Sequence, residues 1–191
     1  MATQVQNQLQ EAVELHPLIA DRFSPRQFDP RPVGDEELQS LFQAARSSPS
    51  SYNEQPWSFL LFRRENEESF EKVLGTLAPS NAAWAAQAPV LLVAVAKREF
   101  THNGRPNRHA QYDLGAAVAN LTVQATALGL SVHQMAGFDA GRAREEFGIP
   151  ETHEAVVAIA VGYSGATRPH RSRKPLSDFV FEGSWGARRS S

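Results

Sequence analysis

Near the N-terminus, two arginines and a serine alternate in a segment that could bind an anion. The segment reads "DRFSPRQF" over residues 21–28, and Arg22, Ser24 and Arg26 occupy every second position of it. In an extended backbone alternate side chains project to the same side, so these three would face one ligand together. Arginine presents a planar fork of donors that suits phosphate oxygens. The competing interpretation is a solvated basic loop whose arginines pair with the two flanking aspartates.

Two further polar segments could contribute to such a site. The first, "SSPSSYNEQPWSF" at 47–59, combines hydroxyls, amides and two prolines just before the chain turns apolar. Residues of these types gather more often in ordinary turns and caps than in binding sites. The second, "RSRKP" at 171–175, places Arg171, Arg173 and Lys174 near the C-terminus. A run of charges is usually a solvated face, so this segment also has an ordinary interpretation when taken alone.

Several established catalytic motifs are absent from the sequence. It contains no GxGxxG, no GxxxxGKS/T, no HExxH and no GxSxG; "GYSGA" at 162–166 misses the last because alanine stands in the final glycine position. The six histidines are scattered without metal-ligand spacing. Because cysteine is absent, the sequence excludes disulfides, a thiolate nucleophile and cysteine-bound metal clusters.

Composition and charge restrict the class of protein. The chain has 191 residues, of which 41% are hydrophobic and 21% charged, as is typical of a globular domain with one core. A net charge of −2 gives no general attraction to nucleic acid or anionic lipid, so neither is expected as a partner. The longest apolar run, 88–96, is too short to span a bilayer. These features predict a single cytoplasmic domain over residues 1–191.

The segments between the motifs have the periodicities of helices and strands. Apolar residues at helical spacing predict a helix over 35–46 with Asp35 as its cap, and the small-residue stretch 110–128 predicts a long buried helix ended by Gly129. The apolar run that begins at Pro89 predicts a central strand. The other predicted helices are 67–77, 81–87 and 140–147, and the predicted strands are 58–64, 89–96, 131–136 and 154–164.

Two segments lack both periodicities. Residues 97–109 form the longest irregular polar stretch inside the body, and such long loops are typical of lids or substrate loops. Residues 165–191 are predicted to form an extended arm that lies over the body or over a partner subunit.

Taken together, the polar segments resemble the signatures of a known family. In order, "RFSPRQF", "AARSSPSSYNEQPWSF", "ALGLSVHQMAGFD" and "VVAIAVGYSG…RSRKPL" are similar in type and spacing to those of FMN-dependent nitroreductases, from about His16 to Leu176. The resemblance implies an α+β fold with a mixed central sheet flanked by helices. It also implies an intertwined homodimer in which the C-terminal arm, about 165–191, crosses to the partner.

The resemblance assigns residues to the cofactor FMN. Arg22 and Ser24 would hold its phosphate and ribityl end, joined by Arg171 and Arg173. Arg26 would lie near the N1/C2 edge of the flavin. A positive charge at that edge stabilises the reduced, anionic flavin.

The resemblance also implies backbone and loop contacts with the flavin. The backbone amides of Ala136 and Gly137 would face flavin N5, and no side chain is assigned a catalytic role. The loop residues that would line the cofactor, contributed by the other subunit of the homodimer, are Pro49, Ser50, Ser51 and Asn53.

The implied reaction is hydride transfer from NAD(P)H, through flavin N5, to an electron-poor acceptor such as a nitroaromatic, a quinone or an enone. One alternative is a specialised flavoenzyme of the same fold that performs reductive dehalogenation or ring or semialdehyde redox chemistry. Another is a non-catalytic flavin-binding protein. A nucleic-acid binder is disfavoured by the acidic balance of the chain.

Five aromatic and acidic residues near the motifs carry separate expectations. Trp57 and Phe59 are interpreted as core residues in preference to a role in substrate stacking. Trp84 and Trp185 are expected to pack at the dimer interface, the alternative being that they cover the flavin cleft. Glu54 is expected to point to solvent or to an arginine of the partner.

Overall fold

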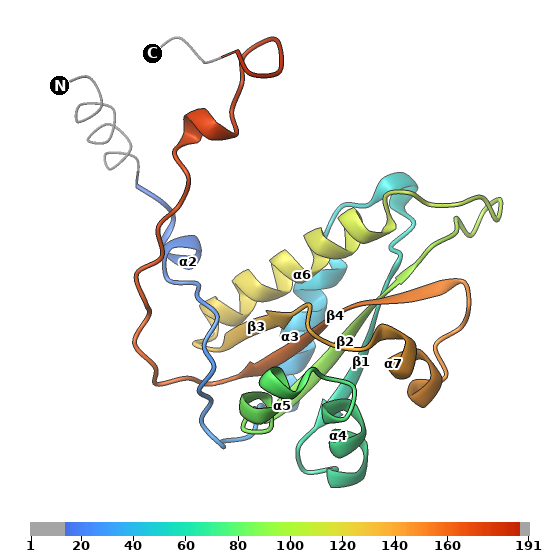
Figure 1. The fold of residues 1–191 in the computed structure, drawn as a ribbon, viewed down its shortest axis with the longest axis vertical. Coiled ribbons are helices and arrows are strands. Elements are labelled where there is room, and N and C mark those ends of the chain that lie inside the picture. Colours follow the sequence, from blue (N-terminus) through green and yellow to red (C-terminus); the bar gives the residue numbers. More distant parts are fainter. Residues whose placement is uncertain (1–13, 188–191) are drawn as a thin grey trace.

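The computed structural model describes residues 14–187, and a four-stranded sheet forms its centre (Figure 1). The strands are β1 (Trp57–Arg63), β2 (Val90–Lys97), β3 (Ser131–Met135) and β4 (His153–Gly162). Their order across the sheet is β1-β2-β4-β3, and every neighbouring pair is antiparallel. The predicted α+β class is confirmed. Among residues 14–187 no pair of neighbouring strands is parallel, so the sheet described is antiparallel and not mixed as predicted.

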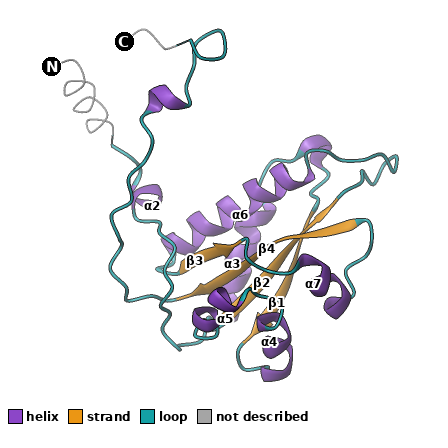
Figure 2. Ribbon diagram, viewed as in Figure 1, coloured by secondary structure: helices purple, strands orange, loops and turns teal. Residues whose placement is uncertain are grey.

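Helices cover both faces of the sheet (Figure 2). Helices α3 and α6 pack on one face, whereas α4, α5 and α7 lie on the other. Along residues 14–187, no helix is long and apolar enough to cross a membrane. The helices are α2 (Pro17–Ala20), α3 (Asp35–Arg46), α4 (Glu67–Leu74), α5 (Pro79–Ala85), α6 (Ala110–Ala127) and α7 (Ala140–Phe147).

Strand β2 explains why one segment of the sequence is apolar without interruption. Alternate residues from Val90 to Ala96 enter the core beneath α3 and α6, and those from Leu91 to Val95 enter the core beneath α4 and α5. Successive side chains of a strand point to opposite faces, so a strand covered on both faces must be apolar at each position. The prediction of a central strand here is confirmed.

Helix ends follow the sequence where glycine is available. Helix α7 has the predicted bounds and ends at Gly148, whose φ of 63° lies in the left-handed region that favours glycine. Helix α6 is followed by Gly129 with a φ of 73°. The left-handed backbone conformation at these two positions therefore explains why the sequence has glycine there.

The helix predicted at 81–87 is α5, which spans Pro79–Ala85, and two other predictions at helix ends were also wrong. The cap of α3 is Gly34, whose amide donates to the Glu37 carboxylate at 2.7 Å, while Asp35 forms an ion pair with Arg63. Helix α4 ends at Leu74, before the predicted limit of 77, because Leu77 forms a β-bridge with Phe138. In both cases a tertiary partner displaced the local preference.

The strand register places the two ends of the sheet far apart. Trp57 pairs with Ala96 at one end, whereas Arg63 pairs with Val90 at the other. These pairs are six residue steps apart along β1, which corresponds to about 20 Å. Strands β1 and β3 form the opposite edges of the sheet, separated by three strand spacings or roughly 14 Å. Segments that enter at diagonal corners of the sheet are therefore well separated.

Beyond β4 the chain leaves the body as an extended arm (Figure 1), and its place over a partner subunit stays a prediction. Residues 167–180 are exposed throughout, and Leu176–Asp178 form a single 3-10 turn. The arm carries large apolar side chains in solvent, among them Trp185, which is 93% exposed. Solvated apolar side chains gathered in one arm are typical of a surface that packs on another molecule. The others are Leu176, Phe179 and Val180.

Candidate functional site

The arginine-bearing N-terminal segment lies along the edge strand β3 and the end of β4. The carbonyl of Pro25 accepts a hydrogen bond from His133 Nδ1 of β3 at 2.7 Å. The amide of Asp29 donates to the carbonyl of Tyr163, just beyond β4, at 2.9 Å. The backbone that carries Ser24 and Arg26 is thus fixed at both ends.

A stack of rings beneath the segment adds to this attachment. Trp84 lies between Phe28, at 6.3 Å between ring centroids, and His133, at 4.4 Å. Trp84 is buried within the core, so its expected place at a dimer interface was wrong. The reason is that α5 presents this ring to the face of the sheet beneath residue 28.

Tyr163 links Arg31, in the segment that precedes α3, with Glu37 of α3 itself. Its hydroxyl donates to Glu37, and the guanidinium of Arg31 lies 3.5 Å from the centre of its ring. The hydrogen bond from Tyr163, followed by that from the Gly34 amide, holds the pKa of Glu37 below its ordinary value. The same bond to Glu37 raises the pKa of Tyr163.

The pKa of His133 lies below its ordinary value, chiefly because the ring is partly buried. Hydrogen bonds to the Pro25 and Ser24 backbone act in the opposite direction and raise the pKa, whereas the charge of Arg26 lowers it further. At pH values between this lowered pKa and the ordinary value of about 6.5, His133 binds a proton more readily in the unfolded chain than in the folded one. The free energy of unfolding is therefore expected to fall as pH decreases below about 6.5. His133→Gln should weaken that dependence, as measured by urea unfolding at two pH values.

The control for this prediction is His170→Gln in the exposed arm, which should keep the wild-type difference between the two pH values. An unchanged pH difference in the His133→Gln protein would contradict the assignment. It would mean that another group causes the loss of stability in acid.

The arginines of the candidate site are not engaged by carboxylates. Within the part of the chain that the structure describes, Arg22, Arg26, Arg171 and Arg173 form no ion pair. Arg22 instead donates to the Ser24 hydroxyl at 3.3 Å. The interpretation of this segment as a basic loop paired with its neighbouring aspartates is therefore not supported. The guanidiniums are available to an anion.

The arm arginines are not joined to the N-terminal segment in one chain. Arg173 donates only to the neighbouring carbonyl of Ser172, at 3.4 Å. Among the described residues, no hydrogen bond links Arg171 or Arg173 to residues 22–26. Their joint contact with a phosphate remains a prediction.

The turn after β3 presents two free backbone donors. Ala136 and Gly137 are both exposed, and among the hydrogen bonds of residues 14–187 none is donated by either amide. The Gly137 carbonyl is fixed by the Ala78 amide at 2.9 Å and by Asn81 Nδ2 at 3.0 Å. A Cβ at position 137 would lie 2.7 Å from Asn81 Nδ2, so glycine permits this close approach. The turn is thus held through its carbonyl, while neither amide has an acceptor among the described residues.

The polar loop before β1 holds an unusual backbone conformation. Tyr52, Asn53 and Gln55 have φ values of 55°, 55° and 50°, which side chains with a Cβ rarely adopt. The Ser51 amide donates to the Asp113 carboxylate at 3.0 Å, and the Gln55 amide donates to the Ser50 hydroxyl at 3.0 Å. Part of the loop's polarity therefore serves its own conformation. Strain held in this way is frequent at functional sites.

Glu54 connects the loop to the segment that follows β2. Its side chain is only 5% exposed and accepts hydrogen bonds from Lys97 Nζ at 3.4 Å and from the Thr101 amide at 2.8 Å. Burial alone would raise the pKa of Glu54, but the bonds from Thr101 and Lys97 outweigh it and lower the pKa. The expectation that Glu54 points to solvent or to a partner's arginine was wrong, because its partners lie within the same chain.

The segment 97–109 is a hairpin. Glu99 bridges Pro106, the Phe100 amide donates to the Arg105 carbonyl at 2.9 Å, and Gly104 takes a φ of 68° at its tip. The hairpin and the loop before β1 lie at the same end of the sheet, because the Lys97 amide donates to the Pro56 carbonyl at 2.7 Å. Trp57 and Phe59 pack on the core as predicted.

The expected site residues thus form two groups within one chain. Arg22, Ser24, Arg26 and the turn at 136–137 lie beside β3, whereas the loop 47–56 enters β1 at the opposite edge of the sheet. The loop members are Pro49, Ser50, Ser51 and Asn53. A single chain does not bring the two groups together.

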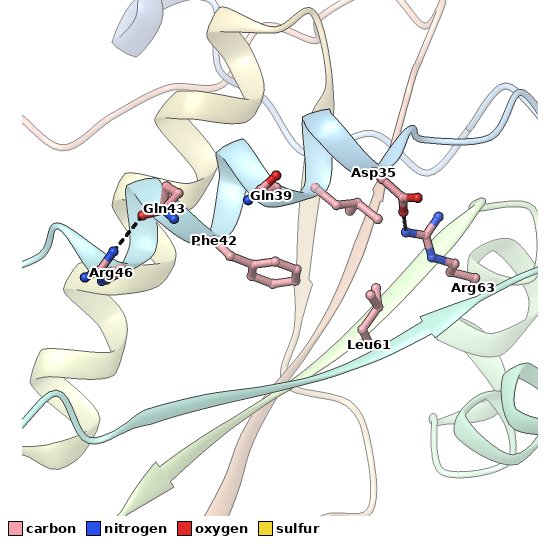
Figure 3. A pocket seen from close by; sticks show the side chains of 8 residues that line it. Asp35, Gln39, Phe42, Gln43, Arg46, Leu61 and Arg63 are labelled. Atoms are coloured by element: carbon pink, nitrogen blue, oxygen red, sulfur yellow. Dashed lines mark hydrogen bonds and ion pairs between the residues drawn. The ribbon is translucent and has the colours of Figure 1, made fainter.

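An open groove of about 340 Å³ runs between α3 and β1 (Figure 3). Phe42 and Leu61 face each other across it, and an ion pair between Asp35 and Arg63 lies at one end. The outer edge of β1 pairs with no strand among residues 14–187. Leu61 and Arg63 of this edge strand line the groove.

Sequence reasoning missed the residues that hold the site in place. His133, Asn81 and Asp113 bind backbone groups of the three functional segments. Asp113 had a visible signal, because it is one acidic residue within a helix of small and apolar residues. Among the residues described, no cluster of three or more histidine, aspartate or glutamate side chains could hold a metal ion.

Comparison with known proteins identifies the family. The model of the nitroreductase family matches residues 19–163. A solved structure titled as an oxidoreductase containing FMN superposes with a TM-score of 0.85 at 31% identity, covering 93% of this chain and 96% of that one.

Two relatives are similar in sequence. A Streptomyces griseus protein named "Putative NADH dehydrogenase/NAD(P)H nitroreductase" is 26% identical over 72% of this chain and 79% of its own length. An iodotyrosine deiodinase of Daphnia pulex is 23% identical over 90% of this chain and 67% of its own length. The chain belongs to the nitroreductase family and is an oxidoreductase of that family.

Proposed function

We propose that the protein is an FMN-dependent oxidoreductase that passes hydride from NAD(P)H to an electron-poor small molecule by a ping-pong mechanism. The observation that carries the proposal is the rigid turn at Ala136 and Gly137, whose two amides have no acceptor in residues 14–187. Two fixed donors next to a segment of unpaired arginines suit a planar, anionic cofactor. One domain over residues 1–191 and a cytoplasmic location are part of the same proposal.

The residues present fit FMN. Arg22 and Ser24 would hold its phosphate with Arg171 and Arg173, and Arg26 would face the N1/C2 edge. Because these guanidiniums have no carboxylate partner among the described residues, a dianion would bind them without breaking an ion pair. When bound, FMN supplies hydride chemistry at N5.

The chain's own groups would orient the cofactor and set its charge environment. The amides of Ala136 and Gly137 would donate toward N5, and the missing Cβ of Gly137 keeps the turn close to α5. The guanidinium of Arg26 would favour negative charge at the opposite edge of the ring. Neither role requires a side chain that transfers a proton.

A homodimer would complete each site. The loop residues Ser50, Ser51 and Asn53 lie at the opposite edge of the sheet from the β3 group, so we propose that a second copy brings them to the cofactor. The exposed apolar arm and the unpartnered groove beside β1 support an exchange of arms between copies. An arm strand added to the edge of β1 could provide the parallel neighbour of a mixed sheet.

The visible spectrum of the purified protein tests the proposal. The protein is expected to be yellow, to lose its flavin absorbance when NADH or NADPH is added without oxygen, and to regain it on adding a quinone. A colourless protein that takes up no added FMN would contradict the proposal. If FMN binds but turnover with NAD(P)H is no faster than with free flavin, the non-catalytic alternative is correct.

The similarity to an iodotyrosine deiodinase favours one second candidate, reductive dehalogenation. In that reaction NAD(P)H would supply two electrons, and an aryl halide would exchange its halogen for hydrogen with release of halide. Reoxidation of the reduced protein by halogenated phenols and by nitroaromatics, with halide release measured in parallel, separates the candidates.

A further inference from the structure

Three rings contact one another where the polar loop meets the hairpin. Tyr52 lies edge-on to Phe100, at 5.7 Å between ring centroids, and 5.8 Å from His102; Phe100 and His102 are 5.3 Å apart. Tyr52 is nevertheless 83% exposed. Large aromatic surface that is grouped and left in solvent is typical of a binding surface.

The cluster of Tyr52, Phe100 and His102, which we term the aromatic wall, is held rigidly. Glu54, two residues after Tyr52, accepts hydrogen bonds from the amide and the hydroxyl of Thr101, which lies between the two hairpin rings. Lys97 completes the network by donating to the Thr101 hydroxyl at 2.6 Å. The buried Glu54 carboxylate, paired with the half-buried Lys97, joins the loop to the hairpin and fixes the mutual positions of the rings, and such preorganisation lowers the entropic cost of binding.

The backbone at Tyr52 supports a role beyond packing. Its φ of 55° is followed by a φ of 55° at Asn53, and the loop is secured to α6 by Asp113. A conformation of this kind persists only where the surroundings impose it. It turns the ring of Tyr52 toward the hairpin and away from the core, since the side chain contacts Phe100 and His102 and stays exposed.

The charge of the wall indicates which ligand it would take. Lys97 and Glu54 neutralise each other beneath the rings. The exposed faces thus offer stacking surface with little net charge, and rings of this kind prefer offset or edge-on contact with another aromatic ring. A flat, uncharged aromatic compound fits this chemistry better than an ionic acceptor.

We propose that the aromatic wall selects flat, fused-ring aromatic acceptors for the oxidoreductase reaction. This rests on the proposed function, because Ser51 and Asn53, on either side of Tyr52, would line the flavin of the second copy. For a naphthoquinone, NAD(P)H and one proton would yield NAD(P)⁺ and the hydroquinone. The wall contributes binding of the acceptor, whereas the electrons and the hydride come from NAD(P)H.

Steady-state kinetics with two acceptors test the proposal. Tyr52→Leu should raise the KM for 2-methyl-1,4-naphthoquinone about three- to tenfold, the range expected from loss of one aromatic contact. The KM for ferricyanide, a non-aromatic ionic acceptor, should change less than twofold. Tyr52→Phe should leave the naphthoquinone KM near its wild-type value, because this variant keeps the aromatic ring. Tyr112→Leu, an equally prominent exposed tyrosine on α6 outside the wall, is the matched control.

Glu54→Gln tests the positioning role of the network beneath the wall. Loss of the charge should loosen the hairpin, raise the naphthoquinone KM in the same direction as Tyr52→Leu, and leave kcat nearly unchanged. If NAD(P)H still reduces the flavin but the variants change the KM of both acceptors equally, or of neither, the proposed role of the aromatic wall in selecting acceptors is wrong. Absence of that reduction in the wild-type protein would instead overturn the proposed function, and the wall with it.

Discussion

Replacing Leu176, Phe179 and Val180 together by serine is expected to separate the proposed homodimer into monomers that retain no FMN. These side chains are exposed in the single chain and would be buried when the arm lies on a second copy. These side chains are about half exposed, so burying the remainder contributes about 0.8 kcal/mol or more each. Two exchanged arms bury two such sets, together about 5 kcal/mol, so the dimer dissociation constant should rise roughly 10³-fold. Sedimentation velocity and the flavin absorbance of the purified protein measure the two effects.

A matched variant separates packing from charge in the arm. Arg171→Gln with Arg173→Gln keeps the apolar side chains, so the protein should stay a dimer while its FMN affinity falls. A triple serine variant that remains dimeric and fully loaded with FMN would show that the arm is not an interface.

Arg22→Gln is expected to raise the dissociation constant of FMN by roughly 10- to 100-fold, as loss of one charge-assisted hydrogen bond predicts. Riboflavin, which lacks the phosphate, should bind the variant and the wild-type protein equally. Quenching of flavin fluorescence measures both affinities. The control, Arg142→Gln on the exposed surface of α7, should leave both unchanged. An equal loss of riboflavin and FMN affinity would place Arg22 away from the phosphate.

Much of the fold could be predicted from the sequence because its signals are local. The uninterrupted apolar run of β2 requires cover on both faces, and α7 is bounded by residue types that cap helices, with Asp139 at its start and Gly148 at its end. Backbone preferences and periodicity act over a few residues, so a single sequence contains them.

What could not be predicted depends on partners distant in the chain. Glu54 is buried because Thr101 lies 47 residues later on a hairpin, and Asp35 leaves the cap of α3 because Arg63 is in reach. Trp84 is a core residue because His133 and Phe28 enclose it. The role of the turn at Ala136 and Gly137 was expected only from the family resemblance, because a free backbone amide does not require a particular residue type.

The separation of the two residue groups on opposite edges of the sheet also bears on inheritance. If each site takes its arginines from one copy and its loop from the other, a chain damaged at Arg22 and a chain damaged at Ser51 are not equivalent losses. In a mixed dimer, both defects fall in one site and the other site is intact. Two inactive alleles of this gene would therefore complement each other in the same cell.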